Sequence, residues 1–302
     1  MTEGRLRTFV ALADTGSVRA AAARLYVTES AVSAAVAALA RDLDVPLVQR
    51  VGRGVRLTPA GTVYAAYARR VLGLLEQGRA AARGAADPAR GPLRLAAVTT
   101  AADQVLPALL ASFRARWPEV DLALEVGPRR HVWRSLAAHE ADLVLAGRPP
   151  GDLAATVLAL RPNELVVVGA PDLAAGFALP STPWVMREPG SGTRATAEAY
   201  LAEHDVAPPR LVLGSNGAVV AGAAAGLGVA LISRDAVGGE LRAGRLVVID
   251  SPGTPLDRPW HAVAGPAPTA TTRLFVQHLL QAPHWTAPPA PVPAVTESDS
   301  KP

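Results

Sequence analysis

The sequence predicts a multidomain protein: an all-α winged helix-turn-helix unit and a long linker helix, followed by an α/β region. Three patterns in its 302 residues support this prediction. Residues 5–45 show helical spacing of apolar residues interrupted by short turns, and a strand–turn–strand pattern follows. A long amphipathic helix begins at Thr58-Pro59 and stops before a Pro- and Gly-containing hinge at 87–92. From Leu93 onward strands and helices alternate, which is typical of mostly parallel sheets covered on both faces.

The N-terminal unit is predicted to contain three helices with defined ends. Helically spaced apolar residues precede Gly16, which ends the first helix. Ser17 can cap a second helix over 18–25, and Thr28 can cap a third over 29–43, because hydroxyl side chains accept from free N–H groups there. One face of the third helix carries the apolar residues Val32, Val36, Leu39 and Leu43.

A β-hairpin and the long helix complete this part of the chain. Residues 47–50 and 55–57 are strand-like and flank a glycine-bearing turn, which predicts a wing. Thr58 as N-cap and Pro59 at the first helical position start a helix that extends to about residue 85. Its stripe has coiled-coil-like spacing, which predicts dimerisation through residues 59–85; the stripe comprises Val63, Ala66, Tyr67, Arg70, Val71, Leu74 and Leu75.

The α/β region is predicted from short apolar runs between helical stretches. A charge-free run at 214–233 is broken by Ser, Asn and Gly, so it favours a buried helix and strand over a membrane span. The Pro-rich, then polar, tail at 283–302 is expected to be disordered. Helices are predicted at 105–117 and 132–140, and strands at 93–98, 122–126, 143–146, 165–168, 184–186, 229–232 and 246–249.

Charge is unevenly distributed along the chain. Residues 1–90 hold 13 Arg and 7 acidic residues, a net charge of +6, whereas the remainder has a net charge of −2. A basic N-terminal third indicates a nucleic-acid contact at that end. The alternative is a solvated Arg-rich surface in a chain whose only lysine is Lys301.

Several classes of function lack support in the composition. With no cysteine, the chain has no disulfides, thiolate metal ligands or Cys nucleophile. The six His are scattered without metal-ligand spacing, and no Ser-His-Asp arrangement is recognisable. We therefore expect no catalytic residues, no metal and no cofactor. The first residues lack a signal-peptide pattern, so a cytoplasmic protein without a membrane partner is expected.

The second and third helices have the geometry that places a helix in the DNA major groove. The third helix opens with small hydroxyl residues, which can contact phosphates and base edges, and the wing carries arginines that can follow a phosphate strand. The alternative is a generic helical hairpin with hydroxyl caps. We expect DNA contacts from Ser17, Thr28, Glu29, Ser30, Ser33, Arg50, Arg53 and Arg56.

Three N-terminal stretches resemble LysR-type transcriptional regulators. They are LRTFVALADTGS at 6–17, AAAARLYVTESAVSAAVAAL at 20–39 and DLDVPLVQRVGRGVRLTPAG at 42–61. The resemblance covers residues 5–282. It implies a sequence-specific regulator that binds double-stranded promoter DNA, responds to a small-molecule effector, and contacts RNA polymerase if it is an activator. It also implies a homodimer that assembles into tetramers. The family often has Gln at Glu29 and polar or basic residues at Ala34 and Ala35, so base contacts there differ in this chain.

The resemblance also implies the domain organisation. Residues 1–60 would bind DNA, 58–86 would be the linker and dimerisation helix, and 91–282 would bind the effector. The resemblance implies an effector-binding domain of two subdomains of periplasmic-binding-protein type, with the chain crossing between them twice. The first would comprise 91–163 and 246–282, and the second 164–245, with the ligand in the cleft between them.

Candidate effector contacts follow the predicted strands, where backbone N–H groups and hydroxyls can hold an anion. The segment REPGSGTR at 187–194 resembles the subgroup that includes Calvin-cycle and sulfur-metabolism regulators. The alternatives are simple helix caps, an ordinary Gly-rich turn, a solvated Arg148, and an Arg194 that pairs with Glu188 or Glu198. The expected effector-binding residues are Thr99, Thr100, Arg148, Arg187, Gly190, Ser191, Gly192, Thr193, Arg194 and Asn216.

Two other classes of protein fit the α/β region alone. A solute-binding protein would lack the helical module at 1–85 and would carry a signal peptide. An enzyme would need a catalytic motif, and none is recognisable. A ligand-responsive transcription factor therefore explains more of the sequence than either.

Overall fold

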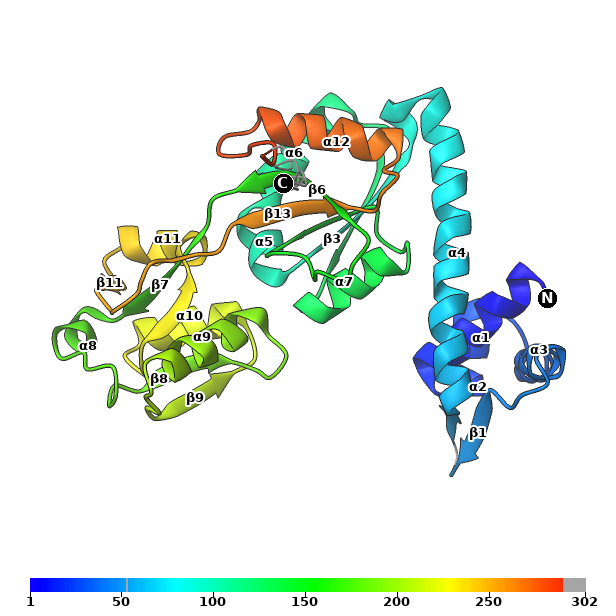
Figure 1. Ribbon diagram of the computed structural model, residues 1–302, viewed down its shortest axis with the longest axis horizontal. Helices are drawn as coiled ribbons and strands as arrows, with labels where there is room; N and C mark the ends of the chain where they lie inside the picture. Colours follow the sequence, from blue (N-terminus) through cyan, green and yellow to red (C-terminus); the bar gives the residue numbers. More distant parts are fainter. Residues whose placement is uncertain (53, 290–302) are drawn as a thin grey trace, which may run out of the picture.

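The computed structural model describes residues 1–52 and 54–289. The winged helix-turn-helix unit lies at one end of a long helix and the α/β region at the other (Figure 1). The side chains of Ser17, Thr28 and Thr58 accept from backbone N–H groups at the starts of α2, α3 and α4, which confirms the predicted caps. The elements of this part are α1 (Glu3–Thr15), α2 (Val18–Leu25), α3 (Glu29–Asp42), β1 (Val48–Val51), β2 (Gly54–Leu57) and α4 (Pro59–Ala86).

The N-terminal core gathers the apolar faces of α1, α3 and the start of α4. Phe9, Val32 and Leu39 are fully buried in it. Leu43 was expected on the buried face of the third helix, and this is wrong. The helix ends at Asp42, and Leu43 lies at the C-cap, where its side chain is exposed.

Helix α4 has three faces with different neighbours. Ala65 and Ala68 pack against the N-terminal core. Gly73 and Gly84 lie against the α/β region, where backbone atoms leave no room for a side chain at Gly73 and the Thr271 hydroxyl is in tight contact at Gly84. The third face carries the predicted apolar stripe and is open in the single chain, with exposed side chains at Val63, Tyr67, Val71, Leu74 and Leu75.

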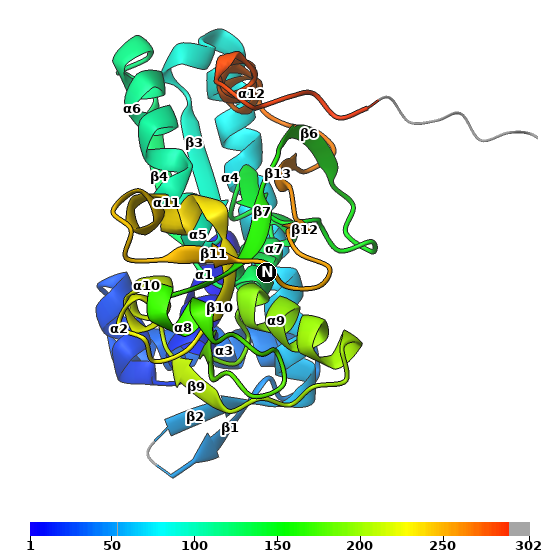
Figure 2. The same cartoon turned by 90° about the vertical axis from the view of Figure 1, so that its left-hand side faces the viewer.

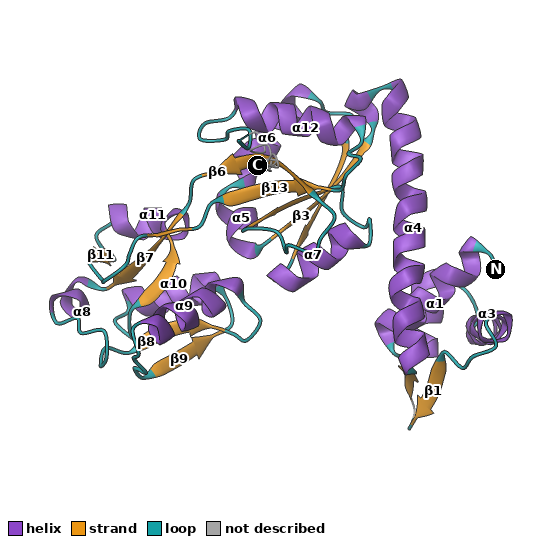
Figure 3. Cartoon of the chain, viewed as in Figure 1, coloured by secondary structure: helices purple, strands orange, loops and turns teal. Residues whose placement is uncertain are grey.

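The first α/β subdomain is built on a five-stranded sheet in the order β4-β3-β5-β13-β6. Strands β3, β4 and β5 run parallel, whereas β13 is antiparallel to both of its neighbours. Helices lie on both faces (Figure 3). The strands are β3 (Pro92–Ala97), β4 (Asp121–Val126), β5 (Leu143–Ala146), β6 (Thr156–Arg161) and β13 (Trp260–Ala264), and the helical elements are η1 (Pro88–Arg90), α5 (Thr99–Gln104), α6 (Leu106–Arg116), α7 (Arg129–Ala137) and α12 (Ala270–Gln281).

The second subdomain is centred on β7, which pairs antiparallel with β10, β11 and β12 (Figure 2). A parallel pair, β8 and β9, lies beside this sheet, and Trp184 bridges to Val229. Its strands are β7 (Glu164–Gly169), β8 (Trp184–Arg187), β9 (Arg210–Leu213), β10 (Ala230–Ser233), β11 (Val247–Ile249) and β12 (Leu256–Asp257), and its helices are α8 (Pro171–Ala175), α9 (Gly192–Glu203), α10 (Asn216–Ala224) and α11 (Arg234–Arg242).

The two segments that connect the subdomains are joined to each other. Asn163 lies between β6 and β7, and Arg258 lies between β12 and β13. The backbone N–H of Arg258 donates to the carbonyl of Asn163 at 2.8 Å, and the Asn163 side-chain amide donates to the carbonyl of Arg258 at 2.8 Å. This reciprocal pair fixes the two crossings side by side.

The antiparallel strands contradict the expectation of mostly parallel sheets. In the described α/β region only β3–β4, β3–β5 and β8–β9 pair in parallel. The double crossing accounts for two of the antiparallel pairs, β6–β13 and β7–β12, because the chain passes between the subdomains in opposite directions. The expected boundary at 246 is also wrong, since β11 and β12 pair with β7 in the second sheet.

Other sequence expectations have mixed outcomes. The helix expected at 105–117 is confirmed as α6, and a separate short helix that was not expected, α5, precedes it and ends next to Val105. The run at 214–233 forms α10 and β10 as expected, and in the described ranges no helix is long and apolar enough to span a bilayer. Disorder from residue 283 is contradicted in part: Trp285 is buried and Thr286 bridges to Leu160. Residues 290–302 lie outside the described residues.

Candidate functional site

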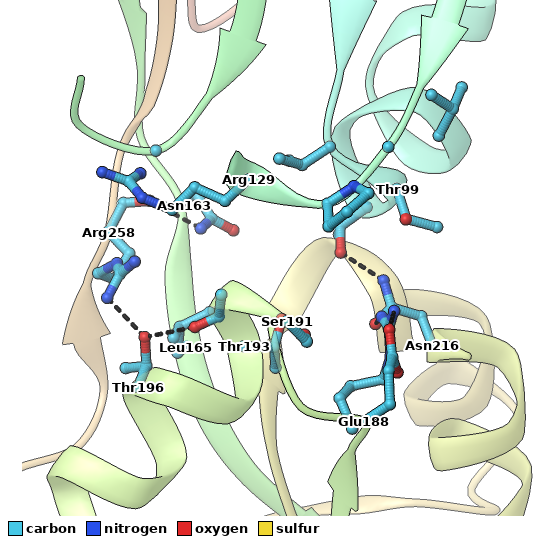
Figure 4. A pocket seen from close by; sticks show the side chains of 18 of the residues that line it. Thr99, Arg129, Asn163, Leu165, Glu188, Ser191, Thr193, Thr196, Asn216 and Arg258 are labelled. Carbon is cyan, nitrogen blue, oxygen red and sulfur yellow. Dashed lines mark hydrogen bonds and ion pairs between the residues drawn. The ribbon is translucent and has the colours of Figure 1, made fainter. Parts of the chain in front are cut away.

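A cavity of about 370 Å³ lies between the two subdomains. Its walls come from the residues that follow β3, β4 and β5 in the first subdomain and β8 and β9 in the second. Both crossing segments also contribute, through Asn163 and Arg258. The close-up in Figure 4 shows Arg129, Asn163 and Arg258 toward one end of the cavity and Thr99 and Asn216 toward the other.

Two arginines give this cavity a positive end. Arg129 Nη2 donates to the carbonyl of Arg148 at 2.5 Å, and Arg258 Nη1 donates to Thr196 Oγ1 at 2.6 Å. Within residues 1–52 and 54–289, neither guanidinium has a carboxylate partner within ion-pair distance. Burial lowers the pKa of Arg258, and burial together with the charge of Arg258 lowers the pKa of Arg129. Both side chains remain charged, because arginine cannot be deprotonated at physiological pH.

Gly147 leaves room between these two guanidinium groups. A Cβ at this position would lie 3.6 Å from Arg129 Nη1 and 3.7 Å from Arg258 Nη2. The two groups therefore converge on one point next to the β5 end. Two converging guanidinium groups can bind a carboxylate or phosphate through several charge-assisted hydrogen bonds.

The opposite wall is a hydrogen-bonded network that joins the subdomains. Asn216 Nδ2 donates to Thr100 Oγ1 at 2.5 Å, and Arg187 Nη1 donates to Asn216 Oδ1. Arg187 also donates from Nε and Nη2 to the Glu188 carboxylate at 2.7 and 2.8 Å. This bidentate pair holds the pKa of Glu188 below its usual value and neutralises the charge of Arg187. The network end of the cavity is therefore polar but nearly neutral.

The structure brings most of the sequence-predicted effector residues to the cavity. Those that line it are Thr99, Thr100, Arg187, Ser191, Gly192, Thr193 and Asn216. Their contact with a ligand stays a prediction.

Three sequence-predicted residues lie outside the cavity, which contradicts their expected place. The Arg148 side chain is exposed, and only its carbonyl meets Arg129. Arg194 pairs with Glu198 at 2.8 Å, the alternative weighed from the sequence, because the two residues are one helical turn apart on α9. Gly190 lies in the preceding turn, with φ of 90°, and lines a separate hollow between α9 and α7.

The cavity residues missed from the sequence include the polar side chains of Arg129, Asn163, Thr196 and Arg258. Arg129 could have been found, because GPRR directly follows the predicted strand at 122–126. Asn163 and Arg258 had no local signal. They enter the cavity only through the paired crossings, which are a property of the tertiary topology.

Most of the expected DNA-contacting residues are exposed in the N-terminal unit. Thr28, Glu29, Ser30 and Ser33 are exposed on the first turns of α3, and Thr28 Oγ1 lies 2.9 Å from Ser30 Oγ. Ser17 is half-buried as the cap of α2. Two of the wing arginines, Arg50 and Arg56, are exposed on β1 and β2, whereas the third, Arg53, lies outside the described residues.

Ser33→Ala tests the recognition surface. Val32 is fully buried while Ser33 is exposed, so the substitution removes a hydroxyl from the surface and leaves the core unchanged. We expect DNA affinity to fall about three- to tenfold, as one neutral hydrogen bond is worth about 1 kcal/mol, with Tm shifted by no more than about 2 °C. Fluorescence anisotropy on DNA selected by the wild type and a thermal melt measure the two quantities. A loss of Tm with normal affinity would instead make Ser33 a structural residue.

Arg56→Ala tests the wing. If Arg56 contacts a phosphate, the slope of log K against log salt should fall by about 0.9, because one fewer counterion is released. Arg114, exposed on α6 in the other domain, provides the matched control, and Arg114→Ala should leave the slope unchanged. Equal slopes for wild type and Arg56→Ala would remove Arg56 from the phosphate contacts.

Comparisons with known proteins identify the family. The family model described as "Bacterial regulatory helix-turn-helix protein, lysR family" matches residues 4–62, and the one described as "LysR substrate binding domain" matches residues 86–283. The HTH-type transcriptional regulator CbbR of Rhodospirillum rubrum is 34% identical over 265 residues, which cover 86% of this chain and 88% of the relative. The chain therefore belongs to the LysR family: it is a DNA-binding transcriptional regulator with a C-terminal effector-binding domain.

Solved structures agree with the fold. A full-length OxyR variant from Pseudomonas aeruginosa superposes with a TM-score of 0.69 at 21% identity, covering 94% of this chain and 96% of that one. The regulatory domain of Synechocystis PCC6803 CcmR, solved in complex with 2-PG, has a TM-score of 0.57 at 28% identity and covers 63% of this chain and 96% of that one. The winged helix-turn-helix followed by a two-subdomain α/β region, expected from the sequence, is confirmed.

Proposed function

We propose that this regulator binds promoter DNA as a homodimer and responds to a small carboxylated or phosphorylated acid in the inter-subdomain cavity. The observation that carries the proposal is the pair Arg129 and Arg258, which converge next to Gly147 without a carboxylate partner in the described chain. Two half-buried cations without a counter-ion favour an anionic ligand, because a bound anion offsets the cost of burying them.

The comparisons support the class of ligand and of target. CcmR, which is similar in its regulatory domain, was solved with 2-PG. The similar proteins CbbR and the RuBisCO operon regulators favour carbon-fixation genes as targets. We further infer a cytoplasmic protein that needs no cofactor besides its effector, assembles from dimers into tetramers, and contacts RNA polymerase if it activates transcription.

Thermal unfolding of the full chain with a panel of small acids tests the ligand. The panel comprises 2-PG, inorganic phosphate, a dicarboxylate and a neutral polyol, each at matched ionic strength. A true effector should stabilise by about 2.7 kcal/mol at a hundred times its Kd and follow RT ln(1 + [L]/Kd). If no acid gave a saturable shift beyond that of sodium chloride, the anion-binding proposal would be wrong.

A further inference from the structure

Helix α7 extends from the effector cavity to the linker helix. Its first residue, Arg129, lines the positive end of the cavity. The turn that follows its last residue lies directly against α4 at Gly73 (Figure 1). A Cβ on Gly73 would lie 2.0 Å from the carbonyl oxygen of Ala138 and 2.9 Å from the carbonyl carbon of His139. Only glycine allows this contact between two backbones.

The helix and its turn form one rigid piece. Val132, Trp133 and Leu136 are buried against the first sheet, and the Arg129 guanidinium lies 5.8 Å from the centre of the Trp133 ring. The turn is held to the helix by backbone hydrogen bonds, among them one from Ala138 to Arg134 at 2.9 Å and one from Glu140 to Ser135 at 2.8 Å. A shift at the Arg129 end therefore moves the turn as well.

The α4 end of this contact leads to the DNA-binding unit. Arg69 lies one helical turn before Gly73, and its Nη2 donates to the Asp14 carboxylate of α1 at 2.5 Å. Asp14 also pairs with Arg24 of α2 at 3.2 Å. Burial and the charge of Arg70 in α4 lower the pKa of His139, in agreement with its place beside the helix. The same stretch of α4 thus touches α1 on one side and the turn after α7 on the other.

We propose that α7 couples the effector cavity to the linker helix: displacement of Arg129 when an anion binds moves the 138–139 turn at Gly73, and through α4 the DNA-binding unit. This coupling rests on the proposed function for its physiological trigger. The mechanical link itself belongs to the ligand-free chain, so it can be tested without an effector. Packed side chains and rigid secondary elements can carry coupling between distant sites.

Amide hydrogen exchange on the ligand-free full chain tests the link in both directions. Arg129→Gln should raise exchange about threefold or more in α4 around residues 70–77, and Gly73→Ala should do so in the cavity segment 127–129. Gly78 is an exposed glycine of α4 whose Cβ would meet nothing within 4 Å, so Gly78→Ala is the matched control for Gly73→Ala. Arg130, the exposed neighbour of Arg129, provides the control Arg130→Gln. Neither control should change exchange at the distant end.

The link is overturned if each substitution alters exchange only at its own end. Should Gly73→Ala fail to fold, Arg129→Gln alone tests the link, because amide exchange in α4 either rises in this variant or does not. A second measurement uses 2-PG as probe, with DNA selected by the wild type from a random pool. Gly73→Ala should still bind 2-PG saturably but lose the effect of 2-PG on DNA affinity, whereas Gly78→Ala keeps it.

The two proposals fail in different ways. If the wild type does not bind 2-PG or another acid, the proposed function is wrong, and the exchange experiment still decides on α7. If 2-PG binds and Gly73→Ala responds to it as the wild type does, the cavity proposal stands and the coupling through α7 is wrong.

Discussion

Arg258→Gln is expected to weaken effector binding about 10- to 100-fold, because a charge-assisted hydrogen bond contributes about 1.5–3 kcal/mol. The guanidinium is half-buried, donates to Thr196 and has no carboxylate to hold its charge in the described chain. Gln keeps part of the volume and removes the charge, so the loss should appear in affinity and not in folding. Isothermal titration of the full chain with the acid that stabilises it most gives the Kd.

Arg148→Gln is the matched control for this prediction. Arg148 follows Gly147 directly, yet its side chain is exposed, and the carbonyl that accepts from Arg129 is retained in the variant. Its Kd should stay within about twofold of wild type, as expected for an exposed charge. If Arg148→Gln lost as much affinity as Arg258→Gln, the positive end of the cavity would have been assigned to the wrong arginines.

Replacing both Leu74 and Leu75 by Glu is expected to convert the dimer into monomers and lower DNA affinity more than about 100-fold, since two linked half-sites bind with an avidity gain of about 10²–10⁴. The two leucines are 57% and 42% exposed in the single chain and lie on the open face of α4 with Val63, Tyr67 and Val71. In a dimer formed through this face the introduced carboxylates would be buried without partners, which is strongly unfavourable.

Leu74→Ala with Leu75→Ala separates loss of packing from the introduced charge. This pair should weaken the dimer without abolishing it, because it removes apolar contact area and adds no charge. Sedimentation velocity across a concentration series measures both double variants. A wild-type sedimentation coefficient for the Glu double variant would place the dimer interface on another surface.

The sequence was most informative where structure is determined locally. Ser17, Thr28 and Thr58 each cap a helix within a few residues, so the start of α2, α3 and α4 could be predicted from hydroxyl placement alone. Strand β6 was missed because the short apolar run at 157–160 has no clear strand periodicity, although a polar stretch at 161–164 separates it from the predicted strand at 165–168. Strand direction has no local signature, so the antiparallel β13 could not be predicted.

In the candidate site, too, residues placed by local signals could be predicted, and residues placed by tertiary contacts could not. Thr99, Thr100 and Ser191 follow strands that the sequence predicts, and the rule that ligands bind beyond strand ends was enough to find them. Arg194 was misplaced because the sequence does not tell on which side of α9 its side chain turns, and Glu198 one turn later holds it away from the cavity.

The reciprocal hydrogen bonds between Asn163 and Arg258 hold the two crossing segments together, so that they form a single hinge between the subdomains. Rotation about this hinge would move the parts of each subdomain far from it most and the hinge residues least. Thr100 and Asn216 lie on facing subdomains, so they would separate as the subdomains move apart, while Arg258 would keep its place. If the subdomains open about this hinge, an entering anion would meet the Arg258 guanidinium already in position, and closure would add the remaining contacts.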